Sequence, residues 1–119
     1  MRAVPDLLTP FRWTMTRTAP DSMTAEVDTE SAVFAGHYPG EPIVPGVCLV
    51  DLVCQAAAAL GLTSGGPELA VERARFTSPV RPGDRLTVSV SGGTEGEVRG
   101  IVRHDRGVAC RITLRAGVA

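Results

Sequence analysis

The sequence predicts an α+β fold in which an antiparallel sheet curls about one central helix. Two observations lead to this prediction. Several segments alternate apolar and polar residues with a period of two, which is typical of half-buried strands. One segment, from Val47 to about Leu60, has helical length and is apolar on nearly every face. A helix of that kind is enclosed by other structure, so we expect the strands to cover it.

The first strands follow from this alternation, taken in chain order. "MTAEVDTESAVF" places apolar residues at alternate positions before the helix, and "LTVSVSG" does the same after it. The expected inward residues of these two strands are Met23, Ala25, Val27, Leu86, Val88 and Val90. Between the helix and "LTVSVSG", the stretch "LAVERARFTSPV" predicts another strand, closed by the Pro-Gly turn "RPGD" from Arg81 to Asp84.

The last two strands are expected to form a hairpin. "EVRGIVRH" and "VACRITLRA" continue the period of two, and the turn-like "DRG" from Asp105 to Gly107 joins them. The expected inward residues are Val98, Val102, Val108, Cys110, Ile112 and Leu114.

Length and charge bound the functional class. The 119 residues predict a single domain, residues 1–119, which is small enough to be stabilised by a partner subunit. A net charge of −1, from 12 basic and 13 acidic residues, indicates neither a nucleic-acid partner nor an anionic membrane. The opening segment contains Arg2, Arg12 and Arg17 without a sustained apolar core, so we expect no signal peptide or spanning helix and a cytoplasmic location.

The three cysteines do not form a metal-binding or redox motif. They lack CxxC spacing, and Cys48 and Cys54 lie six residues apart, on different faces of the expected helix. We expect them to be small buried apolar residues, and we expect no metal ion and no cofactor.

Asp51 and Gln55 are the two polar residues within the apolar run. They are four residues apart and so share one stripe of the helix. A buried carboxylate is costly unless it is paired or protonated. One interpretation is structural, with both residues satisfying the amides of a neighbouring loop. The other is that Asp51 is a catalytic acid.

The loop before the helix offers complementary groups. Pro45 and Gly46 at the helix start leave the amides of Gly46 and Val47 without intrahelical partners, and the positive end of the helix dipole points the same way. These amides suit a developing oxyanion. His37 precedes them and can exchange a proton near neutral pH, although a solvated turn histidine is the plainer interpretation.

These residues lie in a stretch that resembles a known family. "FAGHYPGEPIVPGVCLVDLVCQ" is similar to the signature of the 3-hydroxyacyl-acyl-carrier-protein dehydratases of fatty acid and polyketide synthesis, and "ARFTSPVRPGDRL" is similar to their second block. The resemblance implies the hot-dog fold, in which an antiparallel sheet wraps one long helix. It also implies dehydration of a 3-hydroxyacyl thioester, carried on acyl carrier protein or coenzyme A, to a trans-2-enoyl thioester.

The resemblance also implies residue roles and an assembly. His37 is the expected base, Asp51 the expected acid and Gly46 the donor of the oxyanion amide, with Val47 beside it and Gln55 orienting Asp51. In the family the histidine and the acid of one site come from different subunits, so we expect a homodimer or a heterodimer with another hot-dog chain. The commoner branch of the family has glutamate where Asp51 stands, and aspartate occurs in the branch that also isomerises the double bond.

Two other functions stay open at this point. Hot-dog acyl thioesterases also place an acid on the central helix, although most lack a motif like "GHYPG". The third possibility is a non-catalytic hot-dog subunit that completes a partner's active site.

Overall fold

The computed structural model describes residues 13–27, 43–62, 70–93 and 96–115. In these ranges the chain forms six strands and one helix. They are β1 (Met15–Ala19), β2 (Ser22–Glu26), α2 (Gly46–Ala59), β3 (Ala70–Phe76), β4 (Arg85–Gly92), β5 (Glu97–His104) and β6 (Gly107–Arg115).

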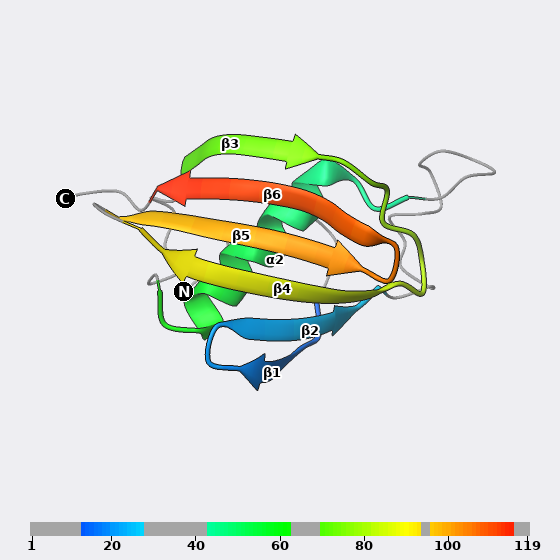
Figure 1. The fold of residues 1–119 in the computed structure, drawn as a ribbon, viewed down its shortest axis with the longest axis horizontal. Helices are drawn as coiled ribbons and strands as arrows, with labels where there is room; N and C mark the ends of the chain where they lie inside the picture. Colours follow the sequence, from blue (N-terminus) through cyan, green and yellow to red (C-terminus); the bar gives the residue numbers. More distant parts are fainter. Residues whose placement is uncertain (1–12, 28–42, 63–69, 94–95, 116–119) are drawn as a thin grey trace.

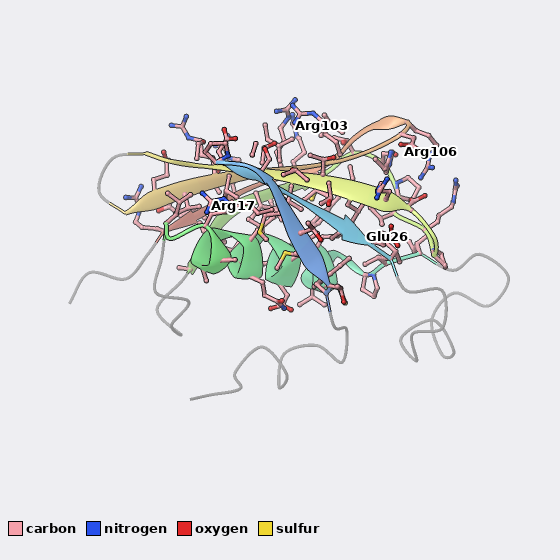
Figure 2. The ribbon with its side chains drawn as sticks, turned by 90° about the horizontal axis from the view of Figure 1, so that it is seen from below. Arg17, Glu26, Arg103 and Arg106 are labelled. Carbon is pink, nitrogen blue, oxygen red and sulfur yellow. The ribbon has the colours of Figure 1, made fainter. Side chains whose placement is uncertain are left out.

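The strands form a single antiparallel sheet with the order β1-β2-β4-β5-β6-β3. Helix α2 crosses one face of this sheet diagonally (Figure 1). Viewed from below, the helix lies entirely on one side, and Arg103 lies on the other side (Figure 2). The predicted α+β class and the predicted hairpin are confirmed, with β5 and β6 joined at Asp105 and Arg106.

The core lies between the helix and the sheet. Leu52 and Val53 of α2 are fully buried, as are Leu86 of β4 and Val102 of β5. Gly100 of β5 makes the close approach possible, because a Cβ there would lie 2.5 Å from a methyl carbon of Val53. The inward residues expected for the first strands are all buried: Met23, Ala25, Val27, Leu86, Val88 and Val90.

Two details of the sheet differ from the sequence prediction. Strand β1 was not expected, because its side chains are exposed or half-buried and show no apolar alternation. In β6, Val108 is only half-buried, and Ala109 is fully buried. The cause is a shift of register, which pairs Val102 with Cys110 but Arg103 with Val108 and so inserts one extra residue.

In the part of the chain that the structure describes, the sheet covers one side of the helix (Figure 2), and Val47 in its first turn is 55% exposed. At the edge of the sheet, all seven residues of β3 are exposed. Among the helices of the described ranges, none has the length and apolar character needed to span a membrane.

Candidate active site

The start of α2 is fixed by its backbone. Pro45 is extended, with φ −60° and ψ 147°, and its carbonyl accepts the amide of Cys48 at 3.0 Å. One residue earlier, the amide of Val44 donates to the carbonyl of Val80 at 2.7 Å, which ties the approach to the helix to the segment before β4. Pro45, the N-cap residue, makes no side-chain capping hydrogen bond. The amides of Gly46 and Val47 belong to the first turn and therefore have no intrahelical acceptor.

Asp51 lies in the second turn and is only 5% exposed. Gln55, one turn further, donates a hydrogen bond from Nε2 to Asp51 Oδ2 at 2.7 Å. The helix residues that follow Asp51, Leu52 and Val53, are fully buried and hold this part of α2 against the sheet. The carboxyl group is thus held in an apolar helix with one oxygen position defined by Gln55. An acid in this setting can exchange a proton with little competition from water.

Two of the three thiols, those of Cys54 and Cys110, are poor nucleophiles at neutral pH. Burial, assisted by the negative charge of Asp51, raises the pKa of Cys54 to about 11. Burial also raises the pKa of Cys110 to about 12, against the opposing effect of a backbone hydrogen bond. Cys48 is buried, and its carbonyl accepts a hydrogen bond from Trp13 Nε1 at 3.1 Å. Because the thiolate is the reactive form, neither Cys54 nor Cys110 is suited to nucleophilic chemistry at neutral pH.

His104, one of the two histidines of the chain, has a structural environment. It is 7% exposed, and its Nδ1 accepts the backbone amide of Arg106 at 3.1 Å. An accepting Nδ1 places the proton of the neutral ring on Nε2, which then donates to Ser78 Oγ at 2.9 Å. Both ring nitrogens are therefore engaged between the hairpin turn and the segment before β4.

The structure brings four of the five candidate residues together on the first three turns of α2: Gly46, Val47, Asp51 and Gln55. His37 lies outside the described residues, so its position relative to Asp51 stays a prediction. Sequence reasoning missed Phe76, whose ring lies against Gly46. The block "ARFTSPVRPGDRL" contains this residue, but nothing local in the sequence indicates that β3 reaches the start of the helix.

Comparison with known proteins adds a family relationship. Residues 16–106 match the model of the ApeI-like family, described as ApeI dehydratase. The chain is 36% identical over 93 residues to the 3-hydroxyacyl-[acyl-carrier-protein] dehydratase FabZ of Sodalis glossinidius, covering 68% of this chain and 62% of the relative. The corresponding enzyme of Pectobacterium atrosepticum is 37% identical, with the same coverage. The chain therefore spans less than two thirds of the length of these curated relatives.

Solved structures show the same architecture. The dehydratase heterocomplex ApeI:P from Xenorhabdus doucetiae has a chain that superimposes with a TM-score of 0.67 at 20% identity. The match covers 88% of this chain and 96% of that one. The predicted hot-dog fold is thereby confirmed.

Proposed function

The chain belongs to the ApeI-like family, and from this premise we propose that it dehydrates 3-hydroxyacyl thioesters to trans-2-enoyl thioesters. One observation of the site carries the proposal: a buried carboxyl group, Asp51, is held by Gln55 one turn from the open amides of a helix start. A dehydratase needs an acid for the departing hydroxyl group and donors for the thioester oxygen, and this helix offers both.

The proposed mechanism assigns one role to each residue. His37 removes the proton next to the thioester carbonyl, and the Gly46 amide donates to the oxygen that gains charge as the enolate-like state forms. Asp51, protonated in the reacting complex, donates to the β-hydroxyl group, which leaves as water while the double bond forms. The balance is one water released per thioester, with a proton moved from carbon to His37 and another from Asp51 to the leaving oxygen. Return of one proton from His37 to Asp51, directly or by way of solvent, restores both groups for the next turnover. No oxidant, reductant or metal enters this balance.

The acyl carrier is part of the proposal. The FabZ relatives are named for substrates on acyl carrier protein, and we extend this to the present chain, with coenzyme A thioesters as the alternative carrier. The same chemistry serves fatty acid and polyketide synthesis.

We also propose that the working unit is a dimer, either of two copies or with a second hot-dog chain. Among the described strands, β3 lies at one end of the sheet with every residue exposed, and the outer backbone edge of such a strand can pair with another chain. The ApeI:P structure is itself a heterocomplex. Mixing inactive His37→Ala and Asp51→Asn chains tests a shared site, because a mixed dimer would contain one intact site. If mixed dimers form and no activity returns, the site is not shared in this way.

Mass spectrometry of defined 3-hydroxyacyl thioesters after incubation with the pure protein tests the reaction. Dehydration removes one water and leaves the thioester intact. Hydrolysis would instead release a free acid and a thiol, as expected of a hot-dog thioesterase. If the thioester stays unchanged, both with this protein alone and after a hot-dog partner chain is added, the protein has neither activity.

A further inference from the structure

Strand β3 carries an aromatic ring to the start of the helix. In the register of the sheet Phe76 lies directly opposite Cys110, which is fully buried on the helix side. Residues directly opposite each other on neighbouring strands project from the same face, so Phe76 also points toward the helix. Its ring tip is aimed at Gly46: a Cβ placed on Gly46 would lie 3.0 Å from Cζ and 3.3 Å from both Cε atoms.

This ring is not a core residue. Phe76 is 49% exposed, although large aromatic side chains are usually well buried. Val47, which follows Gly46 in the chain, is 55% exposed. The open amides of Gly46 and Val47 are therefore bordered by two partly exposed apolar side chains. Such a mixture, in which a few polar donors lie among apolar walls, is characteristic of small-molecule sites.

The ring has two physical consequences for a thioester bound at these amides. It excludes water from one side of Gly46, and a hydrogen bond to a developing oxyanion is stronger where water is excluded. Its exposed part also offers apolar surface that an acyl chain can cover. Glycine at position 46 fits the same arrangement, because any larger residue would press against the ring.

We propose that Phe76 is a specificity-determining residue of this site: its ring forms the apolar wall beside the Gly46 amide and contacts the acyl chain of the bound thioester. The inference rests on the proposed function, and it adds a contact to the acyl chain from a strand that carries none of the proposed catalytic groups.

The test compares Phe76→Ala and Phe76→Leu across 3-hydroxyacyl thioesters of increasing chain length. Phe76→Ala is expected to lower kcat/KM by about 10-fold to 100-fold, with a larger loss for longer acyl chains, because each lost apolar contact weakens binding of the transition state. Phe76→Leu keeps an apolar wall and should recover most of the activity. Val71→Ala is the matched control, since Val71 is 50% exposed and lies near the other end of β3.

A purely structural role for the ring predicts a different pattern. In that case Phe76→Ala would lower the melting temperature or the dimer fraction in light scattering, and the loss of kcat/KM would be the same for every chain length. That result would overturn the assignment, as would wild-type kinetics in Phe76→Ala. If instead the wild-type protein releases no water from the thioester, the proposed function is wrong, and the assignment of Phe76 fails with it.

Discussion

Gln55 Nε2 lies 2.7 Å from Asp51 Oδ2, so the only carboxyl group within α2 is held by a donor from the next turn of the same helix. The hydrogen bond is local, and it limits the rotation of a group that packing already buries. A carboxyl group in a fixed orientation at the edge of an apolar core is costly to maintain. That cost is understandable if the group reacts.

Replacing Asp51 with Asn separates catalysis from stability. The amide preserves the size of the side chain and can still bond to Gln55, but it cannot supply a proton. We expect turnover to fall by ~10²-fold or more, while thermal stability is retained or increased because a costly buried acid has been removed. A melting temperature well below that of the wild type, with activity intact, would support the structural interpretation of Asp51.

Cys54 reports on the charge of Asp51. Because burial and Asp51 raise the pKa of the thiol to about 11, we expect slow alkylation of native protein by iodoacetamide at pH 8. Asp51→Asn removes the second cause, so the pKa of Cys54 should fall and its alkylation should become faster. Cys110 is the internal control, since its pKa of about 12 does not depend on Asp51. Equal alkylation rates of Cys54 in both proteins would contradict this coupling.

The environment of Asp84 predicts that the folded protein loses stability at acidic pH. Partial burial disfavours its charge, but hydrogen bonds from Arg106 and from the amide of Arg81 outweigh this and hold the pKa of Asp84 below its ordinary value of 3.8. A carboxyl group with a lowered pKa stabilises the fold above its unfolded pKa, and this contribution is lost as the pH falls through the folded value.

We therefore expect the free energy of unfolding to decline below about pH 4. Asp84→Asn should be less stable at pH 6 and should decline less steeply below pH 4. Urea titrations at pH 6, 4 and 3 measure both effects. An acid slope as steep in the variant as in the wild type would show that other groups cause the decline.

Arg75 and Arg111 face each other across β3 and β6 on the exposed side of the sheet. Like charges in directly opposite positions destabilise a sheet. Arg111→Glu should therefore raise the melting temperature by roughly 1–5 °C, and added salt should reduce the difference. Arg85→Glu is a control with the opposite expected sign. Arg85 already pairs with Glu26 at 3.6 Å, so reversing its charge should lower the melting temperature. A lower melting temperature for Arg111→Glu would contradict the repulsion.

Local sequence patterns predicted those features that depend on contacts between residues close together in the chain. The spacing of Asp51 and Gln55 places both on one helical stripe, and the hydrogen bond between them follows from it. The alternation of apolar and polar residues in β4 correctly predicted which of its side chains are buried. Strand β1 could not be predicted in this way, because it is held by backbone pairing to β2 and its residues show no apolar alternation.

Contacts between distant segments were also beyond sequence patterns. Phe76 meets Gly46 only because β3 pairs with β6 at the edge of the sheet and brings the ring to the helix start. Likewise, the extra residue at Ala109 follows from the register of β6 against β5, and it leaves Val108 half-buried instead of buried. Both features depend on the pairing of strands far apart in sequence.

The most direct test of the account follows one 3-hydroxyacyl thioester by mass spectrometry with wild type, His37→Ala and Asp51→Asn side by side. We expect the wild type to convert it to the enoyl thioester with loss of one water, and each variant to do so at least ~10²-fold more slowly while remaining folded. Release of free acid by the wild type, or undiminished dehydration by either variant, would contradict the account.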